Sequence, residues 1–433
     1  MTSRYRVEYA LKVHRRDEFI EWIKGLLAVP FVLHSGNGIT ASTSSTGQNT
    51  KVTADARRRY AEVFYDLERL IEDKITQDNC NTPGNSRLKQ LVPTVGEFYT
   101  KLPLERAFYV EDARRSISVR RLVAPSFNDV RLILNTAQVL ALSASGLNPL
   151  KLVTFDGDIT LYEDGLSLTP DAPIVLRLKI LLKRDLYVAL VTAAGYAEIS
   201  GEKYYQRLKG LLDLLVDDQE LTDRQKRNLL IMGGESNFLF RYDTETSRLK
   251  YIADEEWQLE NVKNWDVVNI TKTLDFAEKV LGRVKEQLSL PAVIIRKERA
   301  VGIVAQPGNK LCREQLEEIV LTCQKKLDIF APAQGIKFCA FNGGSDVWVD
   351  IGDKALGVES LQKYIGFTDL GLNHGIGKGQ TLHVGDQFAA IGANDYKARL
   401  SACTAWIANP TETVDILDDL IQYMDEETAM GFV

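Results

Sequence analysis

Apolar side chains recur at the spacing of one helix face along the first third of the chain. Residues 52–76 carry them three or four positions apart, which predicts an amphipathic helix. These apolar positions are Tyr60, Val63, Phe64, Leu67 and Ile71. A second helix is predicted over residues 126–143, because Ser126 and Asp129 have the spacing of a capping box at its start. We therefore expect residues 1–148 to form a helical N-terminal region.

The pattern changes after residue 148, where the apolar runs become continuous. KLVTFD (151–156) and LYVALV (186–191) are almost wholly apolar until their ends. Such runs are typical of parallel strands that are buried on both faces of a sheet. A helical stretch over 201–216 follows the second run, so strands and helices alternate in the order of an α/β fold.

Between residues 235 and 348 the pattern is that of a smaller α+β module. Residues 237–253 read as a hairpin, and alternating helices and strands follow it. The α/β pattern then resumes towards the C-terminus. We therefore predict a core formed by residues 149–234 and 349–433, with residues 235–348 inserted between its two parts as a cap domain.

The composition narrows the classes of function. The chain has 433 residues, 45% of them hydrophobic and 26% charged, and a formal net charge of −6. This charge disfavours nucleic acid and anionic membranes as partners, because both are bound by a basic excess. No apolar run approaches the roughly 20 residues that span a bilayer, and no secretory leader is recognisable. Five cysteines without a CxxC pair predict free thiols in a reducing compartment, so we expect a cytoplasmic protein.

An acidic pair follows the first apolar run of the core. Asp156 and Asp158 flank one glycine directly after KLVTF, and open α/β sheets bind ligands beyond the carboxyl ends of their strands. Two carboxylates placed there can divide phosphoryl transfer between a nucleophile and a general acid/base. Their combined charge opposite a phosphate requires a divalent cation, which predicts Mg²⁺. The alternative is a tight acidic turn that merely ends a strand.

Further polar positions follow in the order that such chemistry requires. Thr192 ends the second apolar run and could hold a phosphate oxygen, and Lys354 begins a predicted helix and could bind the same phosphate. Asp386 ends a third apolar run and could ligate the metal, with Asn394 and Asp395 close behind it. Each has an ordinary alternative, namely a turn residue or a solvated lysine. Their order along the chain favours a shared site.

This series of residues resembles the four motifs of the haloacid dehalogenase superfamily, and the insertion resembles the large α+β cap of one branch. GGSDVWVDIGDK and GDQFAAIGAND are also similar to phosphomannomutases of that branch. FDGDITLYEDG, MGGESNFLFRY, HVGDQFAAIGANDYKAR and ACTAWIANPTET together resemble the family of IMP-specific 5′-nucleotidases, over nearly the whole chain. The resemblance implies a Rossmann-like haloacid dehalogenase core with a parallel sheet, an inserted α+β cap and a helical N-terminal region.

The resemblance also implies roles for the motif residues. Asp156 would be the nucleophile that forms an aspartyl-phosphate, and Asp158 would be the general acid/base. Thr192 and Lys354 would bind the phosphate. Mg²⁺ would be held by Asp156, by the backbone carbonyl of Asp158 and by Asp386, with support from the residues after Asp386.

Five residues are candidates for binding a nucleoside: Tyr162, Asp164, Asp346, Trp348 and Asp350. Two of them follow the first motif, and three lie where the cap rejoins the core. An indole face can stack on a purine, and carboxylates can bind ribose hydroxyls or the ring N–H of hypoxanthine. Trp348 has the alternative of an ordinary core aromatic.

For the whole chain, the resemblance implies a magnesium-dependent phosphatase that hydrolyses IMP to inosine and phosphate. It also implies activation by ATP at a separate site, for which the helical N-terminal region offers a place, and a homo-oligomer, in this family a tetramer. Two alternatives remain open. One is a phosphohexose mutase with the same motifs, and the other is a catalytically silent nucleotide sensor.

Overall fold

A computed structural model describes residues 17–37, 46–144, 146, 149–196, 199–389 and 392–430. These residues divide into two compact units. The α/β unit contains Leu150–Ala402 and Ile407–Val414, and the helical unit contains Arg16–Pro149, Cys403–Trp406 and Asp415–Val433. The α/β class that the continuous apolar runs predict is confirmed.

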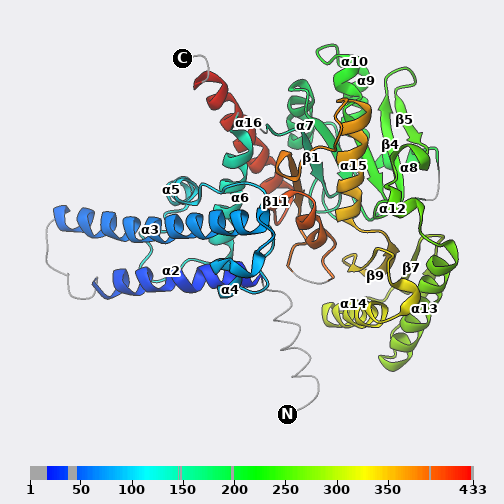
Figure 1. The fold of residues 1–433 in the computed structure, drawn as a ribbon, viewed down its shortest axis with the longest axis horizontal. Coiled ribbons are helices and arrows are strands. Elements are labelled where there is room, and N and C mark those ends of the chain that lie inside the picture. Colours follow the sequence, from blue (N-terminus) through cyan, green and yellow to red (C-terminus); the bar gives the residue numbers. More distant parts are fainter. Residues whose placement is uncertain are drawn as a thin grey trace. The chain divides into compact units, whose positions relative to one another are not determined.

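The α/β unit is built around a mainly parallel sheet (Figure 1). Its strands lie side by side in the order β10 (Thr381–Gly385), β1 (Leu152–Phe155), β2 (Tyr187–Val191), β3 (Leu229–Gly233), β4 (Phe238–Asp243) and β5 (Arg248–Ile252). The first four are parallel, and β4 and β5 are antiparallel to their neighbours. Every residue of the four parallel strands is buried. These strands read as continuous apolar runs because both faces of the sheet are covered.

Helices surround these strands. The bounds in this unit are α7 (Pro173–Lys183), α8 (Glu202–Arg207), α9 (Lys209–Asp217), α10 (Asp223–Lys226), α11 (Asp254–Trp257), α12 (Glu260–Lys263) and α15 (Lys354–Thr368). One face of the sheet packs on α15, where Val358 and Leu361 join Ala189 of β2 in a single apolar cluster. That packing fixes the start of α15, and therefore Lys354, relative to the strand ends.

A second, antiparallel sheet lies within the same unit. Its strands have the order β6 (Ala292–Arg296), β7 (Ala300–Ala305), β9 (Asp346–Ile351) and β8 (Phe338–Asn342). Helices α13 (Val267–Gln287) and α14 (Arg313–Asp328) pack against it, as Figure 1 shows. Val347, Val349 and Ile351 of β9 face this helical layer. Side chains alternate along a strand, so the remaining positions of β9 belong to the opposite face.

The boundary of the insertion differs from our prediction. The hairpin of residues 237–253 exists as β4 and β5, but β4 pairs with β3 and so extends the larger sheet. Leu239 of this hairpin packs in the same apolar cluster as Leu230 and Met232 of β3. The second sheet and its two long helices therefore lie within residues 267–351, and the predicted start of the cap at residue 235 is too early.

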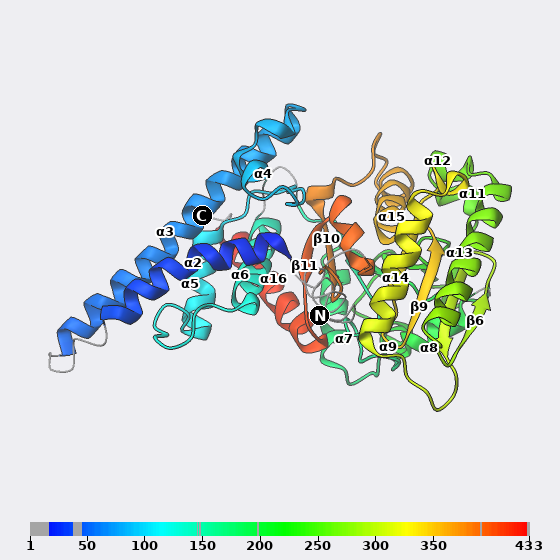
Figure 2. The same ribbon diagram turned by 90° about the horizontal axis from the view of Figure 1, so that it is seen from below.

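The helical unit confirms the helices predicted near the N-terminus. It contains α2 (Glu18–Asn37), α3 (Thr46–Asn79), α4 (Arg87–Leu91), α5 (Leu104–Arg115) and α6 (Phe127–Ser143), with α2 alongside α3 in Figure 2. Tyr60, Phe64 and Ile71 of α3 are buried, as their spacing predicts. At the start of α6 the Ser126 backbone N–H donates to Asp129 over 2.7 Å, and the Asp129 N–H donates back to the Ser126 hydroxyl. This is the predicted capping box.

The C-terminal segment is a second difference from the predicted domains. Residues from Asp415 onwards, in α16 (Pro410–Met430), group with the helical unit and not with the core. Arg114 of α5 donates to both carboxylate oxygens of Asp419, each over 2.7 Å. The sequence pattern missed this because an amphipathic helix does not identify the surface that it covers. Among the described residues, no helix is long and apolar enough to cross a membrane.

Candidate functional site

The predicted motif residues meet at one edge of the parallel strands. Asp156 directly follows β1, Thr192 follows β2 and Asp386 follows β10. Because β10, β1 and β2 are parallel neighbours, their carboxyl ends share this edge. The backbone N–H of Asp156 donates to the carbonyl of Val384 over 2.9 Å, which joins the first motif to the fourth.

A fully buried lysine lies between two carboxylates at this edge. Lys354, the first residue of α15, donates to Asp156 over 2.7 Å and to Asp395 over 2.5 Å. The Asp353 side chain accepts from the backbone N–H of Leu356 and so caps the same helix. The helix therefore fixes the backbone of Lys354, and the two carboxylates fix its ammonium group.

Asp395 is in turn held by several donors. The His383 Nε2 lies 3.1 Å from its carboxylate, and the backbone N–H of Gln387 donates to it over 2.9 Å. Burial lowers the pKa of His383, which favours the neutral ring, and its Nδ1 lies 2.8 Å from the Thr154 hydroxyl. Burial by itself raises the pKa of Asp395, but Lys354 and His383 outweigh it and hold that pKa at about 2. Asp395 is thus an ionised carboxylate fixed in one orientation.

Three carboxylates at this edge fit a metal ion. Oxygen atoms of Asp156, Asp386 and Asp395 lie within 4.8 Å of one another, the one such acidic group found among the described residues. Burial raises the pKa of Asp156 to about 6, although Lys354 opposes this. Burial and the charges of Asp395 and Asp156 raise the pKa of Asp386 to about 8. The repulsion between neighbouring carboxylates opposes their ionisation, and a bound divalent cation would remove that repulsion. Carboxylate oxygen atoms are ligands that suit Mg²⁺.

Asn394 supplies further support for an ion at this place. Its amide oxygen is buried and has no hydrogen-bond partner among the described residues. A buried polar atom without a partner calls for an explanation such as a bound ion or water. The structure thus places Asp395, which the sequence predicts only in support of the metal site, in the same acidic group as Asp156 and Asp386.

Asp158 has a different environment from Asp156. Its side chain is 36% exposed and lies 3.8 Å from the Arg207 guanidinium, and it accepts from the backbone N–H of Gly165 over 2.9 Å. The intervening Gly157 is required by space, because a Cβ there would lie 2.6 Å from the Tyr162 hydroxyl. The Asp156 carboxylate is therefore buried against Lys354, whereas the Asp158 carboxylate is partly exposed to solvent.

The predicted nucleoside residues fall into two groups. Asp346, Trp348 and Asp350 alternate along β9, on the face opposite its apolar packing. Burial raises the pKa of Asp346, and raises that of Asp350 to about 7. Asp164 approaches the turn that leads into this strand, since its carboxylate lies 3.6 Å from the Cβ position of Gly344, between β8 and β9. Tyr162, by contrast, is buried beneath the Asp156 turn.

Several residues near these motifs were missed by the sequence reading. Arg207 is the last residue of α8, and its guanidinium lies 5.9 Å from the centre of the Tyr162 ring. Glu235 is fully buried, with a positive φ of 51° and no hydrogen-bond partner for its carboxylate among the described residues. His383 had a usable signal, because a lone histidine inside the apolar run TLHVG needs a polar partner. Arg207 lies in an ordinary charged helix and had none.

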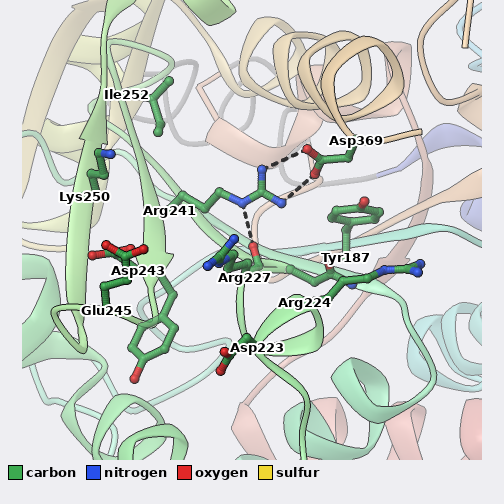
Figure 3. A pocket seen from close by; sticks show the side chains of 12 residues that line it. Tyr187, Asp223, Arg224, Arg227, Arg241, Asp243, Glu245, Lys250, Ile252 and Asp369 are labelled. Atoms are coloured by element: carbon green, nitrogen blue, oxygen red, sulfur yellow. Dashed lines mark hydrogen bonds and ion pairs between the residues drawn. The ribbon is translucent and has the colours of Figure 1, made fainter. Parts of the chain in front are cut away.

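A separate pocket lies at the opposite edge of the larger sheet (Figure 3). It has a volume of about 560 Å³ and is lined from the amino ends of β2 and β3, including Tyr187 and Asn228. Arg241 of β4 donates to both carboxylate oxygens of Asp369, over 3.0 and 2.5 Å. The pocket contains none of the motif residues, and an ion pair already occupies its charged wall.

We expect Asp369→Asn to lower the free energy of unfolding by about 1–3 kcal/mol, because Arg241 would keep its burial and lose a charged partner. The two side chains are only 18% and 16% exposed. Urea unfolding measures the change, which should leave the motif residues undisturbed because the pair lies away from their edge of the sheet. Lys263→Met, which breaks an exposed pair with Glu260, is the control and should change stability by less than about 0.5 kcal/mol. Equal stability of Asp369→Asn and wild type would contradict the expected role.

Comparisons with known proteins agree with this geometry. A family model described as IMP-specific 5′-nucleotidase matches residues 1–417. A protein of Yarrowia lipolytica named IMP-specific 5′-nucleotidase 1 is 58% identical over 427 residues, covering 99% of both chains. The protein of the same name from Saccharomyces cerevisiae is 48% identical over 461 residues, covering 98% of this chain and all of the relative.

Solved structures of Plasmodium falciparum IMP-nucleotidase have the same fold. An IMP-bound mutant is 33% identical, with a TM-score of 0.76 and a coverage of 94% of each chain. An ATP-bound form is 31% identical, with a TM-score of 0.74, and covers 97% of this chain and 88% of that one. The similarity therefore includes the helical N-terminal region as well as the strands that carry the motifs.

Proposed function

The chain belongs to the family of IMP-specific 5′-nucleotidases, and we propose that it is a magnesium-dependent phosphatase that hydrolyses IMP to inosine and phosphate. The observation that carries the proposal is the arrangement of Asp156 and Lys354 beside Asp386 and Asp395 at one edge of the sheet. This arrangement contains a nucleophile, a phosphate-binding cation and a set of carboxylate oxygens. The IMP-bound structure of a relative supports the choice of substrate.

The two acids of the first motif divide the reaction between them. Asp156 attacks the phosphorus atom, the bond to the ribose O5′ breaks, and an aspartyl-phosphate forms. Asp158 gives its proton to the departing O5′, then takes a proton from the water that hydrolyses the aspartyl-phosphate. The exposed position of Asp158 is compatible with these exchanges, and the buried position of Asp156 limits competing hydration.

Lys354 and Thr192 would bind the phosphate oxygens. Lys354 stabilises negative charge that spreads over these oxygens in the transition state. The Thr192 hydroxyl already accepts from the backbone N–H of Ala194 over 3.1 Å, which leaves its own O–H free to donate. Thr192 therefore has a donor left for a phosphate oxygen.

Asp156, Asp386 and Asp395 would hold Mg²⁺, with the backbone carbonyl of Asp158 as a further oxygen ligand. When bound, the ion offsets charge on the phosphate and on the carboxylates around it. The amide oxygen of Asn394 is available as a supporting ligand. Specificity for the nucleoside would come from the face of β9 that carries Asp346, Trp348 and Asp350, together with Asp164, while Tyr162 supports the turn of the first motif.

The family resemblance also suggests how the enzyme is regulated and how its subunits assemble. We propose that ATP activates the enzyme by binding in the helical N-terminal region, and the ATP-bound structure of a relative supports the binding of ATP. We also propose a homotetramer that works in the cytoplasm.

The test is phosphate release from IMP, GMP, AMP and hexose phosphates, each with Mg²⁺ and with EDTA, and with or without ATP. We expect IMP to be the preferred substrate, with turnover lost in EDTA and restored by added Mg²⁺, and increased by ATP. Sedimentation of the same preparation measures the assembly. Release from hexose phosphates but not from IMP would replace the substrate that we propose, and turnover that survives EDTA would remove the metal.

A further inference from the structure

A lysine of the smaller sheet lies over the tryptophan of the proposed nucleoside site. Lys297 is in the turn between β6 and β7, and its ammonium lies 4.1 Å from the centre of the Trp348 ring. It also donates to the carbonyl of Gly195 over 3.4 Å. Gly195 belongs to the loop that starts at Thr192, so this cation lies between the proposed phosphate loop and the nucleoside face.

The position of the Trp348 indole is defined by its contact with a glycine on the neighbouring strand. Gly302 of β7 is paired with Trp348 of β9. A Cβ at Gly302 would lie only 2.5–2.7 Å from three ring atoms, so the ring lies directly against the glycine. Any larger residue at position 302 would displace the indole. The sheet therefore provides a flat aromatic platform at this position.

A carboxylate shares this platform with the lysine. Asp346 lies two residues before Trp348 on the same face of β9, and the Trp348 side chain and the Lys297 charge both lower the pKa of Asp346 against the effect of burial. Alternate residues of a strand project from the same face, so the carboxylate lies beside the indole. One cationic donor and one anionic acceptor thus lie beside the same ring, on neighbouring parts of one sheet.

This pairing of groups matches one edge of a 6-oxopurine. Hypoxanthine presents an acceptor at O6 and a donor at N1–H, side by side. An ammonium donates to the first, and a carboxylate accepts from the second. Adenine has the opposite order, with a donor at N6 and an acceptor at N1, so both contacts would be lost or repulsive. A site built to hydrogen-bond one pattern strongly rejects the reversed pattern.

We propose that Lys297 is a specificity-determining residue, which donates to O6 of a 6-oxopurine stacked on Trp348 while Asp346 accepts from N1–H. The inference rests on the proposed function and names the groups that read the base. Lys297 has three N–H donors and a flexible stem, so it can leave the indole face and the Gly195 carbonyl when a base arrives. Guanine shares the O6 and N1–H edge, so this pair selects against AMP and not against GMP.

The test compares wild type with Lys297→Met, which keeps an apolar stem over the indole and removes the donor. We expect kcat/KM for IMP and for GMP to fall by about 10–100-fold, the usual effect of losing a hydrogen bond from a charged group. For AMP we expect kcat/KM to stay level or rise. The IMP-to-AMP ratio should therefore fall, while the IMP-to-GMP ratio stays unchanged. Inhibition by inosine should weaken to the same extent, and inhibition by adenosine should not, which measures binding without turnover.

Arg296→Met is the matched control, because Arg296 is the cation directly before Lys297, at the end of β6, and pairs with Asp275 and Glu278 of α13. It should leave every ratio unchanged. If Lys297→Met keeps the wild-type IMP-to-AMP ratio, or loses IMP and AMP turnover equally, Lys297 does not read the base. That outcome differs from a failure of the proposed function, in which the wild-type enzyme itself would not prefer IMP.

Discussion

Replacing Asp156 with asparagine is expected to lower kcat for IMP by about 10⁴-fold or more, because no other side chain can form the covalent bond to phosphorus. The protein should still fold. Burial raises the pKa of this carboxyl to about 6, above the ordinary value of 3.8, so its ionisation opposes folding at neutral pH. An uncharged amide in its place should leave the free energy of unfolding equal to or above that of wild type in metal-free buffer.

Activity alone would not separate a nucleophile from a metal ligand, so the test also needs a covalent readout. Borohydride reduces an acyl phosphate to the alcohol, so wild type quenched during turnover should contain homoserine at position 156. The variant should contain none. Asp171→Asn makes the same chemical change at an exposed carboxyl and should retain both turnover and the reduced product. Reduction at any other residue of wild type would assign the nucleophile elsewhere.

Much of this arrangement could be predicted from the sequence. The positions of Asp156, Thr192 and Asp386 follow from three apolar runs, because a buried parallel strand ends where its apolar run ends. The helix start at Lys354 was also predictable. In each case a local pattern determines the position, and the parallel pairing of the strands brings the positions together.

Other parts of the site depend on contacts that no local pattern encodes. Asp395 lies nine residues after Asp386 and reaches the lysine through a short 3-10 helix, Asn394–Leu400. The run of residues between them has neither helical nor strand periodicity. The second partner of Asp395 is His383 of β10. This contact could be predicted only if the pairing of β10 with β1 were known.

The misplaced start of the cap has a similar cause. The alternation in β4 and β5 is the same whether the hairpin joins the larger or the smaller sheet. The hairpin joins the larger sheet because of β3, a strand of only five residues that pairs with β2 on one side and with β4 on the other. A short apolar run can be a strand or part of a buried helix, so the sequence pattern does not identify β3. Without β3, the start of the cap is predicted too early in the chain.

The second large effect is expected for Lys354→Met. The ammonium is fully buried and lies within 2.7 Å of Asp156 and 2.5 Å of Asp395. Removing one partner of a buried ion pair leaves the others uncompensated, which costs about 3–5 kcal/mol of stability. Turnover should also fall by about 10²–10³-fold, because a donor to the phosphate oxygens is lost. Lys363→Met, at an exposed position of the same helix, should change neither quantity.

The pH dependence of that loss identifies its cause. In wild type, Lys354 helps to hold the pKa of Asp395 at about 2, below the ordinary 3.8. A lowered pKa contributes stability that is present above the unfolded-state value and is lost as the pH falls through the folded-state value. Without the lysine that contribution disappears, and protonation of Asp156 relieves the remaining repulsion. The difference between wild type and variant, measured by urea unfolding in EDTA, should therefore be largest near about pH 7 and shrink towards about pH 4. A deficit of equal size at both values would point to lost packing of the lysine stem, and no deficit would mean that the two carboxylates do not need this cation.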